Sequence, residues 1–180
     1  RLRQQYLLVS ASLQTILRKH LKTYRSLDNL ADKVSIHIND THPALCVPEL
    51  MRLLLDEYDY GWDEAWEITC NTLSYTNHTV MSEALERWSE SLFSEQMPRV
   101  YQIVCEINRR LVEDLRAKYG NDMGKINYMA VIANGEIRMA NLCLAACHKI
   151  NGVSKLHTEI LKDSIFRDYY QMDPNRFLNV

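Results

Sequence analysis

The 180-residue sequence has no long apolar run and no strong excess of one charge. No stretch approaches the roughly 20 apolar residues that a membrane-spanning helix needs, and Arg1–Gln5 do not begin a signal peptide. The formal net charge is −2 with interspersed signs, whereas a nucleic-acid surface concentrates Lys and Arg on one face. These absences argue against a membrane protein and against a nucleic-acid-binding protein.

The five cysteines fit reduced core thiols better than a disulfide framework. Their number is odd and they lie within helical apolar patterns, which is typical of reduced thiols in a protein core. A cytoplasmic location is therefore expected. Cys143 and Cys147 share a helical face beside His148, so a metal site is the alternative, but no second pair of ligands accompanies them. We interpret these cysteines as structural thiols.

The length and a hydrophobic content of 47% are sufficient for one globular core. The chain begins at Arg1 and ends in "FLNV" without a helix stop signal, so we expect it to be a piece of a longer protein. Apolar spacing predicts helices over residues 2–21, after Pro48 as far as residues 59–61, over residues 62–73, and from Pro98 to Gly120, the longest of them.

Two short segments read as strands. "KVSIHIND" alternates apolar and polar residues, and "SYTNHTV" is rich in β-forming residues. Because helices follow each of them, a parallel sheet and a helix-rich α/β fold are expected.

The last third is more ambiguous. Asn134-Gly135 is a hairpin signal, yet residues 142–150 look helical, and we favour a brief turn followed by that helix. "NGVSKLH" is expected to be a loop, and Thr158 is expected to cap a last helix. The apolar residues expected on the inner face of this last helix are Ile160, Leu161, Ile165 and Phe166.

Polar clusters follow both predicted strands: "NDTHP" after the first and "TNHT" after the second. Open α/β sheets bind ligands beyond the carboxyl ends of their strands, where the loops converge. Each cluster also has a purely local explanation, since Asn, Asp and Thr are ordinary capping and turn residues. Two such clusters after two strands favour a ligand site.

Several longer motifs follow one another along the chain: "INDTHPAL", "PELMRLLLDE", "WDEAWEIT", "YTNHTV", "EALERW", "NGVSKLHTEILKDSIFRDYY" and "DPNRF". In this order and approximate spacing they resemble the glycogen, starch and maltodextrin phosphorylases, and the match covers essentially the whole sequence. Two departures stand out: Ser82 replaces a proline that many relatives have, and "RMANL" stands where "RINMAHL" is common.

This resemblance implies an α-1,4-glucan phosphorylase, a hexosyltransferase that uses inorganic phosphate to release glucose 1-phosphate from a glucan. Family members need pyridoxal phosphate and are usually homodimers. The implied fold is two Rossmann-like domains facing a cleft (GT-B type), with residues 1–180 forming the later part of the N-terminal, glucan-binding domain. The cofactor lysine and the phosphate-holding residues belong to the C-terminal domain, which has no counterpart here, so we expect this chain alone to bind no cofactor and to be inactive.

The resemblance also implies the site residues. Asp40 and His42 lie near the leaving sugar, and the backbone carbonyl and ring of His78 meet the terminal glucosyl unit, which makes His78 the catalytic candidate. The further substrate-binding residues implied are Thr79, Glu83 and the backbone N–H of Val153.

This set suits a carbohydrate. Carboxylates make strong, directional hydrogen bonds to hydroxyl groups, and a histidine ring both donates and accepts. The carbonyl of His78 presents negative partial charge to an oxocarbenium-like sugar. The alternative, purely structural interpretations are that Asp40 caps a turn or supports a histidine and that Glu83 is only a first-turn helix carboxylate.

Other polar and aromatic residues are assigned structural roles. His148 and His157 are interpreted as structural. Trp62, Trp66 and Trp88 lie in helical patterns, so packing is favoured over sugar stacking.

Two other function classes remain open at the level of sequence. One is a non-catalytic maltooligosaccharide-binding module that retains the same sugar-binding residues. The other is a small metal hydrolase with Asp40, His42 and His78 as ligands, although their spacing fits no familiar zinc pattern. The preferred glucan and any regulation leave no signal in this stretch.

Overall fold

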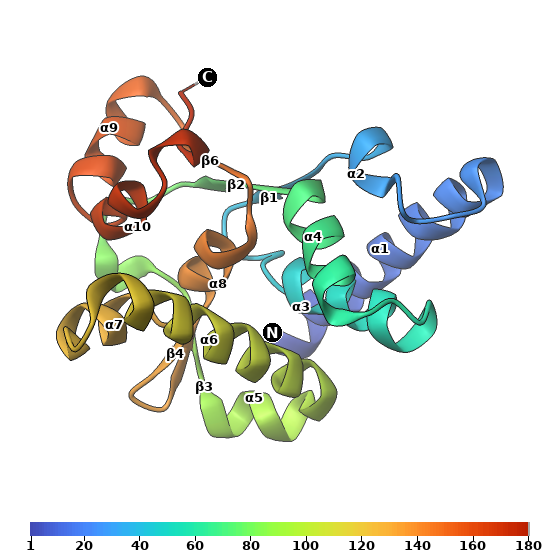
Figure 1. The fold of residues 1–180 in the computed structure, drawn as a ribbon, viewed down its shortest axis with the longest axis horizontal. Helices are drawn as coiled ribbons and strands as arrows, with labels where there is room; N and C mark the ends of the chain where they lie inside the picture. The colour runs from blue at the N-terminus through green and yellow to red at the C-terminus, as the bar shows by residue number, and fades with distance from the viewer. Residues whose placement is uncertain (180) are drawn as a thin grey trace.

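The computed structural model describes residues 1–179 and shows two small β-sheets surrounded by helices (Figure 1). The protein is therefore a helix-rich α/β structure, as its sequence predicts. One sheet is parallel, which confirms the expected strand direction, and the other is antiparallel. The parallel sheet has the order β1 (Ile36–Asn39), β2 (Leu73–Asn77), β6 (Lys149–Gly152), and the antiparallel sheet has the order β3 (Arg87–Ser89), β5 (Glu136–Arg138), β4 (Ile132–Ala133).

The parallel sheet has one apolar and one polar face. Ile38, Tyr75 and Ile150 are aligned across its three strands and are all buried in the core. The opposite face carries hydrogen-bonding side chains, because successive residues of a strand point to opposite faces. On that face Thr76 donates to Asn151 Oδ1 at 2.5 Å.

The first helix, α1 (Leu2–Tyr24), extends three residues beyond its predicted end. Arg25 ends it in the left-handed conformation, with φ of 61° and its N–H donating to Leu21 O. One face of α1 packs into the core through Leu13 and Leu17, which are buried. Amphipathic spacing therefore located this helix correctly.

The helices around the parallel sheet follow the predicted order. Pro48 lies in the first turn of α3 (Cys46–Arg52), as expected, since proline lacks the N–H that would be unpaired there. A π-helical turn (Leu53–Glu57) continues α3 before the chain enters α4 (Trp62–Thr72). The short α2 (Leu30–Lys33) was not predicted.

The helix α6 (Pro98–Tyr119) begins at Pro98 and ends at Gly120, as predicted. Gly120 adopts a φ of 61°, which glycine tolerates. With 22 residues α6 is one residue shorter than α1, so the prediction that it is the longest helix was wrong. Two short neighbours, α5 (Glu90–Gln96) and α7 (Met123–Met129), were not predicted. The predicted apolar stripe of α6 is buried: Val100, Ile103, Val104, Ile107, Leu111 and Leu115.

Asn134 and Gly135 form a hairpin turn between β4 and β5, with φ values of 55° and 73°. The brief turn that we favoured is thus part of a real hairpin. The helix that follows, α8 (Met139–Ala146), begins earlier and ends earlier than predicted. Assigning residues 149–150 to that helix and residues 151–152 to a loop was wrong, because Lys149–Gly152 is the strand β6, whose backbone pairs with β2.

The last helical segment also differs from expectation. The cap of α9 (Lys155–Asp163) is Ser154, whose Oγ accepts the His157 N–H at 3.2 Å, whereas Thr158 lies buried inside the helix. Ile160 was expected to face inward but is partly exposed. The chain continues through α10 (Arg167–Met172) and a 3₁₀ turn (Pro174–Arg176). None of the helices within residues 1–179 is both long and apolar enough to cross a membrane.

Candidate functional site

The three parallel strands end at one edge of their sheet, which we call the carboxyl edge. Asn39 of β1 is paired with Thr76 of β2, and Asn77 of β2 is paired with Gly152 of β6. The residues that follow these strands therefore leave the sheet side by side. Of the predicted site residues, the structure brings Asp40, His78 and Val153 to this edge.

Asp40 forms the sharp turn at the end of β1. Its φ is 63°, in the left-handed region that Asp tolerates better than most residues. The Asp40 N–H donates to Thr76 O at 2.9 Å, and the Asp40 Oδ1 accepts the Thr41 N–H at 2.6 Å. Since one carboxylate oxygen suffices for this turn, Asp40 serves the local fold and still presents a second oxygen for a ligand.

His78 is exposed at the end of β2, and its ring is held by Asn39. The His78 Nε2 lies 2.5 Å from Asn39 Oδ1. An amide oxygen only accepts, so Nε2 carries the proton and the neutral ring offers Nδ1 as an acceptor. Asn39 thus orients His78 across two strands. The sequence of "NDTHP" suggests only a capping or turn role for Asn39, because its contact with His78 depends on strand pairing.

Thr79 continues the same loop and is anchored by Asn77. The Thr79 N–H donates to Asn77 Oδ1 at 2.9 Å, and the Met81 N–H donates to Thr79 Oγ1 at 3.1 Å. Asn77 is itself buried and donates to the Tyr75 hydroxyl at 3.1 Å. Burial raises the pKa of Tyr75 well above its usual value, so this phenol stays protonated. The loop that carries His78 is therefore fixed to the core.

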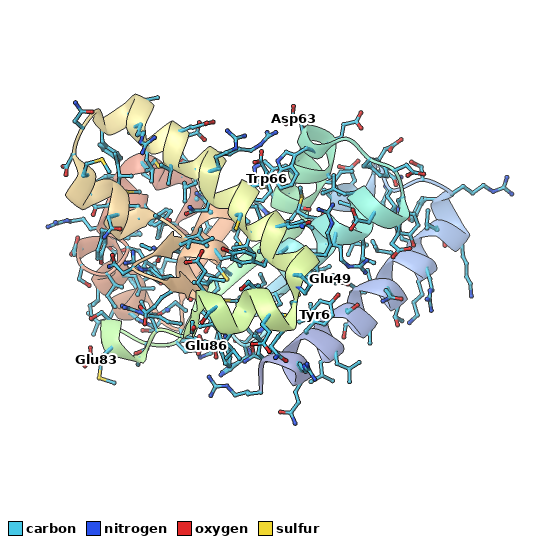
Figure 2. All side chains as sticks on the ribbon, turned by 90° about the horizontal axis from the view of Figure 1, so that it is seen from below. Tyr6, Glu49, Asp63, Trp66, Glu83 and Glu86 are labelled. Carbon is cyan, nitrogen blue, oxygen red and sulfur yellow. The ribbon has the colours of Figure 1, made fainter. Side chains whose placement is uncertain are left out.

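His42 and Glu83 stand apart from this hydrogen-bonded group. His42 is exposed in the turn that leads into α3. Glu83 lies in a 3₁₀ turn (Ser82–Ala84) and is exposed at the periphery of the molecule (Figure 2). Its carboxylate accepts from Ser82 Oγ at 3.4 Å, and within residues 1–179 no hydrogen bond joins it to Asp40 or His78. The structure does not bring Glu83 into the group at the carboxyl edge.

Val153 directs its N–H back into the protein. This N–H donates to His157 Nδ1 at 3.1 Å, while Val153 as a whole is 57% exposed. The resemblance to the phosphorylases implied that this N–H meets a ligand. In the structure it has an internal acceptor, and His157 is the residue that supplies it.

The other residues that we interpreted as structural take part in packing. The His148 Nδ1 lies 2.8 Å from Leu73 O and 3.0 Å from Cys70 O, which ties the segment between α8 and β6 to the end of α4 and the start of β2. Trp62, Trp66 and Trp88 are half-buried and pack against the core.

The cysteines are free thiols. Cys143 and Cys147 are fully buried, and burial raises the pKa of both thiols. A buried neutral thiol is a poor nucleophile and a poor metal ligand. Among the described residues no three His, Cys, Asp or Glu side chains gather as a metal site. These thiols therefore behave as core residues.

A cavity of about 760 Å³ lies away from the carboxyl edge, between α1 and the beginning of α6. Asp40, His78 and Val153 do not line it. Size alone would direct attention to this cavity, but its walls carry no cluster of acids and imidazoles. The charged groups of its lining are the arginines Arg3, Arg18, Arg52 and Arg99, whereas the predicted acid and imidazole, Asp40 and His78, lie at the carboxyl edge.

Comparison with known proteins identifies the family. The sequence profile of the carbohydrate phosphorylases, named Phosphorylase, matches residues 1–180. The chain is 52% identical over 179 residues to the glycogen phosphorylase of Bacillus subtilis (strain 168) and 49% identical over 183 residues to that of Haemophilus influenzae (strain ATCC 51907 / DSM 11121 / KW20 / Rd). It is 42% identical over 190 residues to the muscle form from Ovis aries.

These alignments cover 99%, 100% and 99% of the chain in that order, but only 22%, 22% and 23% of the relatives. The chain thus spans about a fifth of the length of the curated relatives that it matches. The profile covers the whole sequence, and the identities are high throughout. The chain therefore belongs to the carbohydrate phosphorylase family.

Proposed function

We propose that this chain is part of an α-1,4-glucan phosphorylase, a hexosyltransferase that cleaves the terminal glucosidic bond with inorganic phosphate and releases glucose 1-phosphate. One observation carries the proposal: Asp40 and a His78 ring oriented by Asn39 both follow neighbouring strands at the carboxyl edge of a parallel sheet. This edge is where α/β proteins bind ligands. The names of the relatives, glycogen phosphorylase, support the same reaction class.

Residues 1–180 are, in this proposal, the later part of the N-terminal glucan-binding domain of a two-domain GT-B fold. The parallel order β1-β2-β6 with helices on its apolar side supports a Rossmann-like arrangement. The remaining chain would supply the second domain, where pyridoxal phosphate would be held and its phosphate group would provide acid–base chemistry toward the attacking phosphate. No residue of this chain is assigned to hold that cofactor.

His78 has the central role at the site. Its backbone carbonyl places negative partial charge beside the oxocarbenium-like sugar that forms as the glycosidic bond breaks. Because His78 donates its Nε2 proton to Asn39 Oδ1, the ring Nδ1 remains available to accept a hydroxyl hydrogen from the terminal sugar. His78 therefore positions the sugar and stabilises developing positive charge without acting as a proton donor.

The other residues bind sugar hydroxyl groups. Asp40 accepts from the leaving sugar with the oxygen not used by Thr41, and His42 lies on the same side. Thr79 forms the adjoining wall, and Glu83 binds the glucan farther along the chain of sugars. The Val153 N–H donates to a sugar oxygen only by sharing that N–H with His157.

The ligands in this proposal are the α-1,4-glucan, inorganic phosphate and glucose 1-phosphate, and the assembled enzyme is a homodimer. Five free thiols, most of them buried, support a cytoplasmic location.

A phosphorolysis assay tests the proposal. The intact protein that contains this chain is incubated with glycogen or maltodextrin and phosphate, and glucose 1-phosphate is measured. We expect turnover by the intact protein and none by residues 1–180 alone, because half of the reaction chemistry lies outside them. Absence of glucose 1-phosphate from the intact protein, or turnover by the 180 residues alone, would contradict it.

A further inference from the structure

The junction between β6 and α9 is held by side chains of the helix. Two successive N–H groups at the end of β6 donate to them: Gly152 N–H to Thr158 Oγ1 at 3.0 Å, and Val153 N–H to His157 Nδ1 at 3.1 Å. Thr158 Oγ1 in turn donates to Ser154 O at 2.9 Å. Both His157 and Thr158 are buried. The conformation of residues 152–153 is thus set by α9.

Gly152 allows α9 to pack directly against the end of β6. A Cβ added at Gly152 would lie 2.9 Å from His157 Cγ and 2.9 Å from the Thr158 backbone N, closer than real contacts allow. Gly152 is paired with Asn77, and Asn77 directly precedes His78. The imidazole of His157 therefore holds the strand end that lies beside the loop carrying His78.

The tautomer of His157 follows from its hydrogen bond. Because Nδ1 accepts the Val153 N–H, the proton of the neutral ring is on Nε2. The Nε2 atom is buried, and within residues 1–179 it has no hydrogen-bond partner. A buried donor without a partner is costly, so an apolar ring of similar size would be better tolerated if the site only needed filling. This imidazole is suited to accepting one particular N–H.

We propose that His157 is a positioning residue for the glucan site, acting through Val153. By accepting the Val153 N–H it fixes the peptide between Gly152 and Val153 in one orientation beside His78. Val153 is then held at the carboxyl edge in a single conformation, and a sugar oxygen that bonds its N–H shares that N–H with the His157 ring. This inference rests on the proposed phosphorylase function, since it deepens the role of the same site.

The test uses the intact enzyme with three variants. His157→Phe keeps an aromatic ring but removes the acceptor. His157→Asn restores an acceptor near the position of Nδ1. Leu156→Ala is the matched control, because Leu156 is the preceding residue of α9 and is 71% exposed. The measurements are kcat and KM for phosphorolysis, the thermal midpoint, and hydrogen–deuterium exchange of the segment that carries Val153.

We expect kcat/KM of His157→Phe to fall by about tenfold, less than the roughly hundredfold that a 1 Å misplacement can cost, because Val153 is only one of the binding groups. Its thermal midpoint should be unchanged or higher, and the Val153 segment should exchange faster. His157→Asn should recover to within about threefold of the wild type in both rate and exchange. Leu156→Ala should match the wild type.

Two results would overturn the inference. One is full activity and unchanged exchange in His157→Phe. The other is a parallel loss of activity and thermal midpoint in both His157 variants, which would assign a purely structural role. The proposed function fails differently, by absence of phosphorolysis in the wild type, and in that case the exchange data still show whether His157 holds Val153.

Discussion

Asp40 uses Oδ1 to accept the Thr41 N–H, and His78 uses Nε2 to reach Asn39. Each side chain therefore satisfies a local structural need with one atom and keeps another atom for a ligand. This explains why the local and functional interpretations of "NDTHP" and "TNHT" do not compete. At the scale of single residues, the informative substitutions remove the local hydrogen bond but keep the atom that is available to a ligand, or the reverse.

Asn39 offers such a substitution. In the intact enzyme we expect Asn39→Ala to lower kcat/KM for phosphorolysis by about tenfold, because the His78 ring loses the acceptor that orients it. Asn39→Asp keeps an acceptor and should recover part of the loss. Asn121→Ala, in the exposed turn after α6, is the control. Equal activity of Asn39→Ala and wild type would show that the ring needs no support from β1.

Glu49 is the residue on which the packing of α1 against α3 depends. It is fully buried and accepts from Tyr6 at 2.9 Å, from Ser10 at 2.7 Å, and from Arg52 at 2.9 Å (Figure 2 shows Tyr6 and Glu49 beside each other). Burial and the neighbouring carboxylate raise the pKa of Tyr6, so its hydroxyl remains a donor. A buried carboxylate with this many donors is costly to remove because they are left without an acceptor.

We expect Glu49→Ala to lower the free energy of unfolding by about 3 kcal/mol, within the usual effect of breaking a buried ion pair. Glu57→Ala is the control, because Glu57 pairs with the same Arg52 but is exposed, and it should cost less than about 1 kcal/mol. Urea unfolding of the 180-residue chain measures both. Similar small losses for the two variants would mean that solvent reaches Glu49.

At the scale of elements, apolar periodicity predicted α1, α4 and α6 because each has one buried stripe and one polar face. The same argument failed after Asn134. Helix α8 is apolar on nearly all sides, so its periodicity does not mark its end. The strand β6 has four residues, and pairing with β2 decides its conformation more than local preference does.

For the candidate site, too, the sequence located residues within single segments but not the contacts between segments. The clusters "NDTHP" and "TNHT" were recognisable as polar residues after strands, and the resemblance to the phosphorylases implied the roles of Asp40 and His78 within them. The contacts Asn39–His78 and Val153–His157 were not, since the first needs the register of β1 against β2 and the second needs the close approach of α9 to β6. The left-handed conformation of Asp40 was likewise outside the reach of sequence reasoning, because it is fixed by the Thr76 carbonyl.

The hairpin between β4 and β5 gives an element-scale prediction. Gly135 has a φ of 73°, so Gly135→Ala should lower the free energy of unfolding by about 1 kcal/mol through backbone strain. Gly124→Ala is the opposite control: Gly124 lies in α7, and a Cβ there meets Asp122 Oδ1 at an ordinary 3.6 Å. It should stabilise the chain by about 0.5 kcal/mol. Urea unfolding compares the two, and a loss in both would point to tertiary packing instead.

The ion pairs on the exposed face of α6 predict how the stability of the fold depends on pH. Arg109 and Arg110 both bond Glu106 at 2.7 Å and lower its pKa to about 2. The pKa in the folded state lies below the unfolded value, so this stabilisation is present above about pH 4.5 and is lost as the pH falls toward 2. Glu106→Gln should reduce stability by less than about 1 kcal/mol at pH 7 and by nearly nothing at pH 2.

Glu95→Gln is the control for that titration, because Glu95 is exposed and has no ion pair among residues 1–179. Urea unfolding of each variant at pH 7, 4 and 2 gives the comparison. A constant difference between Glu106→Gln and wild type across this range would show that the arginines do not favour the charged form of Glu106.

At the scale of the whole molecule, the proposed ligand-binding groups at the carboxyl edge come from one sheet. Asp40, His78 and Val153 emerge from one sheet, whereas Glu83 lies in a separate peripheral turn. The chain also corresponds to about 22% of each bacterial relative. A sugar held by this edge alone would keep most of its hydroxyl groups in water, so the proposed site needs a second wall from the rest of the protein.

Calorimetry with maltooligosaccharides tests that requirement and separates the phosphorylase fragment from a self-sufficient binding module. Residues 1–180 alone should bind with a Kd weaker than roughly 1 mM, because the few hydrogen bonds of one wall barely offset the loss of translational and rotational freedom. The intact protein should bind markedly tighter, and Glu83→Gln in the intact protein should weaken binding by several-fold. Micromolar binding by the isolated chain would instead favour the module, since a complete site would then exist without any further domain.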